Sequence, residues 1–196
     1  AGEERAAGRR CTTIHADVSA PEDCRRTIAE AVAALGHVDA LVNNAGILRL
    51  ASIEELTPEL WDQTMAVNTR GVFQMTQAII PHMRERKYGR IVNIASLAAR
   101  TGGPGQSHYA ASKSAVVGFT RVSSMELGQY GITVNAVCPG IIKTEMGMNN
   151  LREPERVAYF EKITDLHRLG EPVDVVGPVA FFASDDSAFV TGQALN

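Results

Sequence analysis

The chain has 196 residues, which is enough for one domain with a substantial hydrophobic core. Its net charge is -3, so no basic surface indicates nucleic acid or an anionic membrane as a partner. No apolar run reaches the roughly 18 residues of a membrane span, and we expect neither a membrane anchor nor a signal peptide. The three cysteines are odd in number and lack metal-ligand spacing, which favours a reducing compartment. We therefore expect a cytoplasmic protein.

The first part of the chain alternates predicted strands and helices. Residues 11–18 are rich in β-branched side chains, which predicts a strand. Ser19 is a favourable N-cap, and Glu22 three residues later completes a capping box, so a helix should follow. Residues 38–42 form a short apolar run without polar alternation, which is typical of a strand buried in a parallel sheet.

A long helix is predicted next. Thr57 and Pro58 supply its N-cap and first-turn proline, and its apolar pattern continues to about Arg86. Asn68 and Gly71 lie near its middle and predict an irregularity there.

Two more buried strands are predicted at residues 90–95 and 132–137, with a helix from about Tyr109 to Leu127 between them. Apolar strands that alternate with helices indicate a parallel sheet covered on both faces. The predicted fold class is therefore α/β, a doubly wound parallel sheet of the Rossmann type, and residues 1–196 are expected to form a single domain.

The last part of the chain is less regular. Residues 141–170 form a long segment that we expect to cover the substrate as a lid. A final helix is predicted from about Val173 to Ser184, and Pro178 is expected to kink or restart it.

Tyr109 and Lys113 lie four residues apart, so they share one face of their predicted helix. A tyrosine hydroxyl has a pKa near 10 in water, which is too high for efficient proton transfer at neutral pH. An ammonium about 4 Å away, at an effective dielectric of about 20, would favour the tyrosinate by roughly 4 kcal/mol, or about 3 pKa units. Ser96 follows the strand at 90–95, where a hydroxyl can bind a substrate oxygen. These residues predict general acid–base catalysis.

A Tyr-x-x-x-Lys pair is weak evidence by itself, because such pairs are common on helix surfaces. Here it stands in an ordered set with Asn43-Asn44-Ala45-Gly46, Asn68, Ser96 and Pro139-Gly140. This set resembles the short-chain dehydrogenase/reductase family over essentially the whole chain. The resemblance implies an NAD(P)-dependent oxidoreductase that transfers a hydride between the nicotinamide and a secondary alcohol or ketone.

The resemblance also implies a role for each of four catalytic residues. Tyr109 would be the acid–base residue, and Ser96 would orient the substrate oxygen. Lys113 would bind the nicotinamide ribose and lower the pKa of Tyr109. Asn68 would hold a water molecule that links Lys113 to solvent.

The cofactor, NAD or NADP, is expected at the carboxyl ends of the strands. By resemblance, Asp17 and Val18 contact the adenine, although Asp17 alone is equally well explained as a helix cap. Asn44, Ala45 and Gly46 would lie against a ribose. For Asn43 the alternative is a structural role that ties neighbouring strands together. The nicotinamide end would be contacted by Pro139, Gly140, Ile142 and Thr144.

The sequence departs from the family pattern at both ends. The glycine-rich phosphate loop and its flanking strands have no counterpart, and residues 1–8 read as the tail of a helix. The motif of the last strand is also missing after Asn196. We therefore expect a sheet that is incomplete at both ends, and expect residues 1–196 alone neither to fold cooperatively nor to bind a dinucleotide. The sequence leaves the choice between NAD and NADP open.

Several substrate classes stay open, namely 3-oxoacyl thioesters, sugar alcohols and other small secondary alcohols. The run from Val67 to Phe73 resembles 3-oxoacyl carrier-protein reductases, and Arg90 would suit the acidic surface of a carrier. Tyr130, however, stands where such reductases often carry a second basic residue. A non-catalytic dinucleotide-binding scaffold of the same fold is the alternative function.

Apolar residues on more than one face of two helices predict assembly. Phe73 with Met75, and Val116 with Val117, cannot all face one sheet. The resemblance implies that these helices pair between subunits, so we expect a homo-oligomer and specifically a tetramer.

Overall fold

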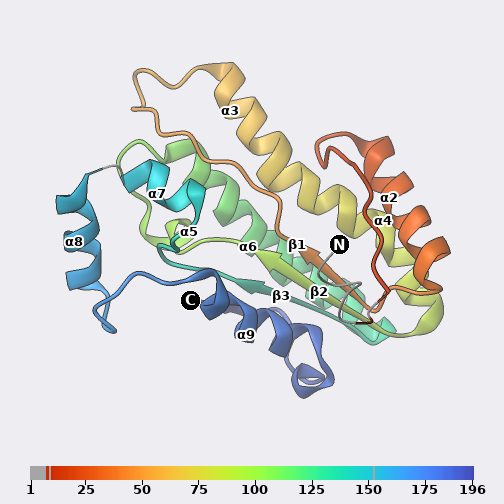
Figure 1. Ribbon diagram of the computed structural model, residues 1–196. Coiled ribbons are helices and arrows are strands. Elements are labelled where there is room, and N and C mark those ends of the chain that lie inside the picture. The colour runs from red at the N-terminus through yellow and green to blue at the C-terminus, as the bar shows by residue number, and fades with distance from the viewer. Residues whose placement is uncertain (1–7, 9, 152) are drawn as a thin grey trace.

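The computed structural model of the protein describes residues 8, 10–151 and 153–196. The prediction that residues 1–8 end a helix therefore falls, apart from Gly8, outside the described residues. Figure 1 shows helices packed around a central sheet. The α-helices are α2 (Pro21–Leu35), α3 (Pro58–Met65), α4 (Gly71–Arg86), α5 (Ala98–Thr101), α6 (Ser107–Leu127), α7 (Glu145–Leu151), α8 (Pro154–Ile163) and α9 (Pro172–Ala183). The strands are β1 (Ala40–Asn43), β2 (Gly89–Ile94), β3 (Ile132–Val137) and β4 (Ala194–Leu195).

The sheet confirms the predicted architecture. Its four described strands are parallel and lie in the order β1-β2-β3-β4. The two central strands pair along their whole length, from Gly89 opposite Ile132 to Ile94 opposite Val137. All residues of β3 are buried, as expected for an apolar strand covered on both faces. The strands predicted at 38–42, 90–95 and 132–137 are therefore all present. The strand at 132–137 has the predicted boundaries, and those at 38–42 and 90–95 are shifted by one or two residues.

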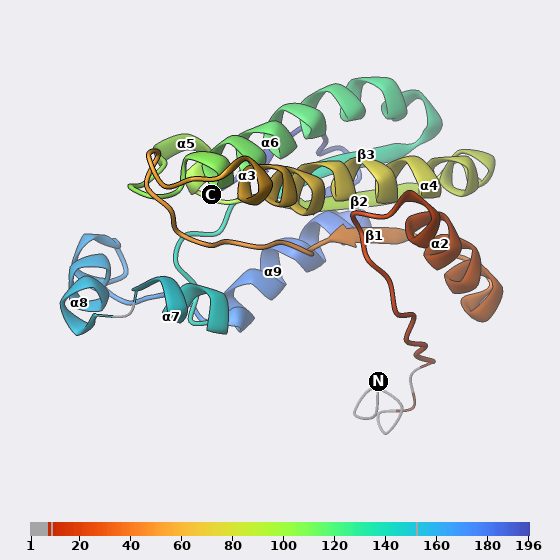
Figure 2. The same ribbon diagram turned by 90° about the horizontal axis from the view of Figure 1, so that it is seen from above.

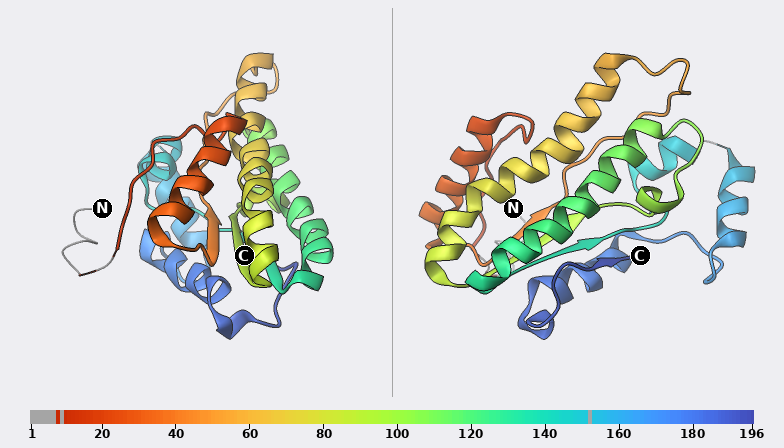
Figure 3. Two further views of the ribbon diagram at one scale, coloured as in Figure 1. Left: turned by 90° about the vertical axis from the view of Figure 1, so that its right-hand side faces the viewer. Right: turned by 180° about the vertical axis from the view of Figure 1, so that it is seen from behind.

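Successive residues of β2 enter different cores, because side chains of a strand alternate between the two faces of a sheet. Ile91 packs in a cluster with Ile79 and Met83 of α4. Val92 packs in another cluster with Phe182 of α9. Figures 2 and 3 accordingly show α9 on the face of the sheet opposite α4 and α6, so the fold is doubly wound.

The predicted irregularity in the long helix is confirmed. Between α3 and α4 the chain forms a π-helical turn, η1 (Ala66–Arg70), which contains Asn68. Gly71 follows directly, and a Cβ atom on it would lie 2.9 Å from Cγ2 of Val18. The absence of a side chain at Gly71 therefore allows residues 17–18 to approach the helix closely.

The predicted strand at residues 11–18 is wrong, because these residues pair with no strand among the described parts of the chain. β-branched residues favour extended backbone, but a strand also requires a neighbour that accepts its backbone hydrogen bonds. Helix α2 holds the segment instead. Arg26 donates to the carbonyl oxygen of His15 at 2.8 Å, and Asp23 accepts from the backbone N–H of Asp17 at 2.8 Å.

The predicted capping box at Ser19 is also wrong. Helix α2 begins at Pro21 with Ala20 as its N-cap, and the Ser19 hydroxyl donates to Oδ1 of Asp17 at 2.7 Å. Proline is favoured in the first helical turn, where its missing N–H has no helical partner, and this fixes the start two residues after Ser19. The predicted partner Glu22 forms an ion pair with Arg25 instead.

Helix α9 runs without a break from Pro172 to Ala183, so Pro178 does not restart it. A capping box formed by Glu171 and Asp174 stabilises its beginning. None of the helices that the structure describes is long and apolar enough to cross a lipid bilayer.

The segment predicted as a lid contains α7 and α8, which lie beyond the carboxyl ends of the strands (Figure 1). Its two ends are joined at one place. Lys143 donates its backbone N–H to the carbonyl oxygen of Gly170 at 2.8 Å, and Gly170 donates to Ile141 at 3.0 Å. The segment therefore leaves and re-enters the domain at a single short parallel bridge.

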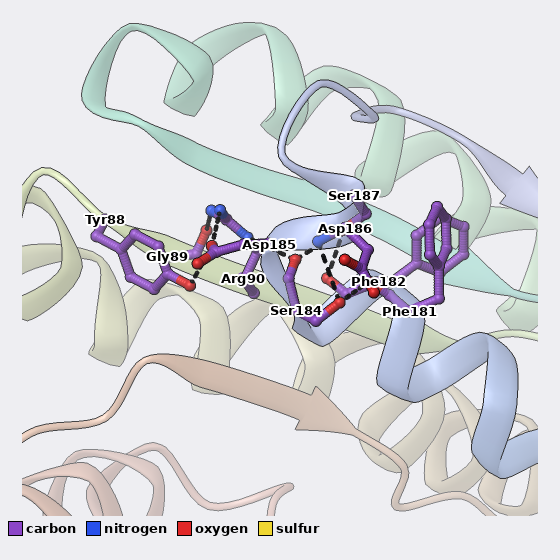
Figure 4. A network of polar contacts seen from close by, with 9 residues as sticks. All are labelled: Tyr88, Gly89, Arg90, Phe181, Phe182, Ser184, Asp185, Asp186 and Ser187. Atoms are coloured by element: carbon purple, nitrogen blue, oxygen red, sulfur yellow. Dashed lines mark hydrogen bonds and ion pairs between the residues drawn. The ribbon is translucent and has the colours of Figure 1, made fainter.

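Arg90 does not serve a carrier protein as predicted, because its side chain is only 5% exposed and is bound within the fold. Figure 4 shows its guanidinium beside Asp185, at 2.9 Å, and stacked on Tyr88, whose hydroxyl donates to the same carboxylate at 2.9 Å. It also donates to the carbonyl oxygen of Ser184 at 3.2 Å. This network joins β2 to the end of α9, at the edge of the sheet opposite the predicted catalytic residues.

Candidate active site

The carboxyl ends of three strands bring the predicted site residues to one edge of the sheet. Asn44 follows β1, Ser96 follows β2, and Pro139 follows β3. The loops after β2 and β3 are bonded directly, because the backbone N–H of Leu97 donates to the carbonyl oxygen of Pro139 at 2.9 Å. Parallel strands place their carboxyl ends side by side, which is why residues far apart in the sequence meet here.

Helix α6 contributes Tyr109 in its first turn and Lys113 one turn later. The Lys113 side chain is 4% exposed, and its Nζ atom donates to the carbonyl oxygen of Ile94 at 2.8 Å. The same Nζ atom lies 5.8 Å from the centre of the Tyr109 ring. The predicted shared face of these two residues is therefore present, and Ile94 connects it to the end of β2.

Burial dominates the electrostatics of this pair. It raises the pKa of Tyr109 above the ordinary value, while the Ser96 side chain acts in the opposite direction through a polar contact. It also lowers the pKa of Lys113 from 10.5 to about 8. The expected lowering of the tyrosine pKa by the ammonium is thus wrong for this structure, since removing a phenolate from water outweighs the contact with Ser96.

Asn68 is fully buried in the π-helical turn and bridges three elements. Its Oδ1 atom accepts from the backbone N–H of Ile47 at 2.8 Å. Its Nδ2 atom donates to the carbonyl oxygen of Ile47 at 3.0 Å and to the hydroxyl of Ser112 at 3.1 Å. Both amide hydrogens are used, and a second lone pair remains on Oδ1. The water-holding role of Asn68 stays a prediction that rests on that lone pair.

Ser112 is a residue of this site that sequence reasoning missed. Its hydroxyl donates to the carbonyl oxygen of Tyr109 at 2.7 Å and accepts from Asn68, while its own carbonyl oxygen accepts from Thr69 at 3.1 Å. The i to i+3 spacing from Tyr109 was the available signal, because it places Ser112 on the side of α6 next to Tyr109. Ser112 thereby ties the first turn of α6 to η1.

Gly46 leaves space beside these polar atoms. A Cβ atom built on it would lie 3.4 Å from both Oδ1 of Asn68 and Nζ of Lys113. The bare backbone at Gly46 and the ammonium donor fit the hydroxyl groups of a ribose, which both donate and accept hydrogen bonds. The residues at this place therefore suit the nicotinamide end of a dinucleotide.

A second group of predicted cofactor residues lines one small hollow. Val18, Asn44 and Ala45 surround a cavity of about 70 Å³ beside η1. Asp17 uses Oδ1 to accept from the backbone and hydroxyl of Ser19, and these bonds lower the pKa of the carboxyl. Asp17 therefore stabilises the turn before α2, but it is not the helix cap that was the alternative to adenine binding, because Ala20 is the N-cap.

Asn43 ties neighbouring strands together, which is the structural role that was the alternative to cofactor binding. Its Nδ2 atom donates to Oδ1 of Asn93 at 2.8 Å, which joins β1 to β2, and also to the hydroxyl of Thr76 at 3.2 Å. Asn93 in turn donates to Thr120 of α6 at 2.9 Å. These buried amides therefore fix the strands beneath the site.

The last group of predicted cofactor residues follows β3. Pro139 is bonded to Leu97, as described above, and Gly140 is exposed. Ile142 forms the bridge to Gly170 at the base of the lid. The Thr144 hydroxyl accepts from the backbone N–H of Gly147 at 3.1 Å and so supports the first turn of α7. In the described part of the chain, no group of histidine, cysteine and acidic residues is arranged to hold a metal ion.

Comparisons with known proteins agree with this geometry. The family model described as enoyl-(acyl carrier protein) reductase matches residues 2–196. Acetoacetyl-CoA reductase of Rhizobium meliloti is 44% identical over 182 residues, which cover 92% of this chain and 74% of the relative. Nodulation protein G of Azospirillum brasilense is 40% identical over 195 residues, covering 100% of this chain and 78% of the relative.

Among solved structures, a gluconate 5-dehydrogenase from Burkholderia cenocepacia in complex with NADP and tartrate has a TM-score of 0.95. It is 34% identical, over 99% of this chain and 76% of that chain. The chain belongs to the short-chain dehydrogenase/reductase family. It is accordingly an NAD(P)-dependent oxidoreductase that interconverts alcohols and ketones.

Proposed function

We propose that Tyr109 is the acid–base residue of this oxidoreductase and that Ser96, Lys113 and Asn68 complete its catalytic set. The observation that carries the assignment is the position of the Lys113 ammonium. It lies 5.8 Å from the centre of the Tyr109 ring, and a side chain at Gly46 would come within 3.4 Å of it. The Lys113 charge therefore lies next to both the Tyr109 side chain, which transfers the proton, and the backbone at Gly46, which we propose contacts the ribose.

The proton chemistry follows from burial. Because burial raises the pKa of Tyr109, the phenol keeps its proton at neutral pH and can donate it to the oxygen of a ketone. Ser96 binds the same oxygen and orients it. When bound, the dinucleotide supplies or accepts the hydride at the substrate carbon. Lys113 remains mostly protonated below its pKa of about 8, and its charge stabilises the tyrosinate left after proton transfer.

We assign the dinucleotide to the carboxyl ends of β1 and β3. Lys113 and the backbone at Asn44, Ala45 and Gly46 would hold a ribose. Val18 would contact the adenine through the hollow that it shares with Asn44. The nicotinamide end would be contacted by Pro139, Gly140, Ile142 and Thr144. Residues 141–170 would close over the substrate as a lid.

The test of the catalytic assignment is Tyr109→Phe, which keeps the ring and removes only the hydroxyl. We expect kcat to fall by at least about 100-fold, the usual scale of general acid–base catalysis, with dinucleotide affinity little changed. Tyr130→Phe is the matched control, since Tyr130 lies in the 3₁₀ turn that follows the other end of α6. Activity that survives in Tyr109→Phe would overturn the assignment.

The substrate is a secondary alcohol or ketone, and its class is tested with a panel. Relatives include an acetoacetyl-CoA reductase, an L-rhamnose-1-dehydrogenase and a putative gluconate dehydrogenase. We propose assaying acetoacetyl-CoA, L-rhamnose and gluconate, each with both coenzymes in the appropriate redox state. Dinucleotide binding without turnover of any ketone or alcohol would favour a non-catalytic scaffold instead.

We further propose a homotetramer in the cytoplasm. Two separate apolar faces support the assembly. One includes Phe73 of α4 and Met125 of α6, which are 44% and 79% exposed, and the other includes Val176 of α9 at 59%. The buried thiols of Cys24 and Cys138, neither of which is in a disulfide, are consistent with a reducing compartment. Light scattering and cell fractionation test these two proposals.

A further inference from the structure

His108 directly precedes Tyr109 in the first turn of α6, and its side chain is 0% exposed. Its Nε2 atom lies 2.9 Å from the carbonyl oxygen of Arg49. A carbonyl oxygen can only accept, so Nε2 must carry the hydrogen and donate it. In the neutral imidazole the lone pair then lies on Nδ1. That atom is buried and has no hydrogen-bond partner within the part of the chain that the structure describes.

The Arg49 carbonyl belongs to a short segment, residues 46–51, that is bonded at three successive points. Asn68 binds both backbone groups of Ile47, at 2.8 and 3.0 Å. His108 binds Arg49, and the carbonyl oxygen of Gly105 accepts from the N–H of Ala51 at 3.0 Å. The segment therefore spans from η1 to the beginning of α6, and its first residue faces Lys113.

We propose that His108 is a positioning residue for the reaction. Its bond to Arg49 holds residues 46–51 against the turn of α6 that carries Tyr109. The dinucleotide-facing backbone at Gly46 and the catalytic hydroxyl thereby keep a fixed separation. Small displacements of reacting groups reduce turnover strongly, so a bond across this short distance has a direct effect on catalysis.

The alternative is that His108 only fills space in the core. The unpaired Nδ1 atom argues against it, because an apolar side chain of similar size would fill the space and leave no buried polar atom unsatisfied. The hydrogen bond from Nε2 to Arg49 explains why a histidine occupies this buried position. Arg49 lies 59 residues away in the sequence, so this bond joins two segments that no local structure connects.

Three variants separate the bond from the volume. His108→Phe keeps a ring and removes both nitrogens, His108→Gln keeps a donor near the position of Nε2, and His108→Asn places its amide too far from Arg49. We expect His108→Phe and His108→Asn to lower kcat and weaken dinucleotide binding by about 3- to 10-fold each, the scale of one lost hydrogen bond. His108→Gln should restore both to within about twofold of the original enzyme.

Affinities for NADH and NADPH are measured by fluorescence titration, and kcat with the fastest substrate of the panel. Thr133→Val is the matched control, since it removes another buried polar atom, a hydroxyl on β3 away from the site that has no hydrogen-bond partner among the described residues. It should leave kcat and both affinities unchanged. Wild-type values in His108→Phe, or an equal loss in His108→Gln, would overturn the proposal. If His108→Phe does not fold, the comparison of the Asn and Gln variants decides it.

This inference rests on the roles proposed for Tyr109 and Lys113, but different experiments test the two proposals. An active Tyr109→Phe enzyme would overturn those roles whatever the His108 variants do. Dinucleotide affinity is measured without turnover, so a normal affinity in His108→Phe and His108→Asn would count against the positioning role even if Tyr109 is catalytic.

Discussion

Lys113 is nearly excluded from solvent and still carries the charge on which the proposed chemistry depends. The residue is 4% exposed, and burial lowers the pKa of its ammonium to about 8. The Ile94 carbonyl oxygen at 2.8 Å compensates part of the lost hydration. Near neutral pH the side chain is therefore still mostly protonated, at a cost in stability.

The first prediction concerns the function of this charge. Lys113→Met keeps much of the volume of the stem and removes the ammonium. We expect kcat to fall by at least about 100-fold and dinucleotide affinity by about 10-fold together, because one group serves both tasks. Steady-state kinetics and fluorescence titration measure the two effects. Lys162→Met, on the surface of α8, is the control, and normal dinucleotide affinity in Lys113→Met would show that Lys113 does not bind the ribose.

The second prediction concerns stability. The fall of the Lys113 pKa from 10.5 to about 8 corresponds to about 3 kcal/mol of destabilisation when the lysine is charged. Replacing the lysine removes this destabilisation but also removes the hydrogen bond to Ile94, which costs about 1 kcal/mol. We therefore expect Lys113→Met to raise the free energy of unfolding near neutral pH by about 1–3 kcal/mol, measured by urea denaturation.

The pH dependence of this difference has a definite sign. Between pH 8 and 10.5 the unfolded chain binds a proton at Lys113 that the folded protein does not. The free energy of unfolding of the original protein should therefore rise with pH across this window relative to the variant. The advantage of Lys113→Met should be complete below pH 8 and should shrink as the pH approaches 10.5. A difference that does not change with pH would contradict the cause assigned here.

At the scale of elements, the two ends of β2 have separate tasks. Its carboxyl end leads to Ser96, whereas its amino end carries Arg90, which binds the end of α9 through Asp185 and Ser184. Arg90 is buried and Asp185 is 79% exposed, so the pair lies partly in solvent. The network fixes α9 on its face of the sheet and lies away from the catalytic residues.

The third prediction follows from that separation. Asp185→Asn keeps the shape of the side chain and removes the charge that faces the buried guanidinium. We expect the free energy of unfolding to fall by about 1–2 kcal/mol, below the cost of breaking a fully buried pair, because the carboxylate is exposed. Both kcat and KM should stay within about twofold. Asp186→Asn is the adjacent control, and an unchanged midpoint in denaturant for Asp185→Asn would show that the ion pair contributes nothing.

For the whole molecule, several large apolar side chains are exposed, and packing within a single chain does not explain them. Val122 and Met125 of α6 are 55% and 79% exposed, and Val173 and Val176 of α9 are 71% and 59% exposed. These helices lie on opposite faces of the sheet (Figure 2). Two faces on opposite sides allow each subunit to contact two others, which is the arrangement of a symmetric tetramer.

The fourth prediction tests this assembly. Phe73→Glu should disrupt the face formed by α4 and α6, and Val176→Glu the face formed by α9. We expect the original protein to be a tetramer by light scattering at micromolar concentration, each single variant to be a dimer, and the double variant to be a monomer. Leu166→Glu in the lid, where the side chain is 75% exposed, is the control. A monomeric original protein would refute the assembly.

Much of the site follows from sequence order, because the motifs at Asn44, Ser96 and Pro139 follow strands, and Tyr109 and Lys113 stand in the first turns of a helix. The spacing of Tyr109 and Lys113 predicts their shared face, and the run at Asn44 predicts backbone beside a ligand. The long-range contacts of Ser112 and His108 escape this reasoning. Their partners are Asn68, 44 residues away, and Arg49, 59 residues away, and no local pattern indicates either contact.

The sequence by itself determined the parallel α/β architecture, the positions of β2, β3 and α6, and the irregular turn at Asn68. These features depend on hydrophobic period and on residues that are neighbours in the chain. Only the tertiary structure decided that residues 11–18 are not a strand, that Arg90 is buried beside Asp185, and that burial raises the pKa of Tyr109. Strand pairing, ion pairing and desolvation each depend on which distant residues come into contact, and that is set by the packing of the whole domain.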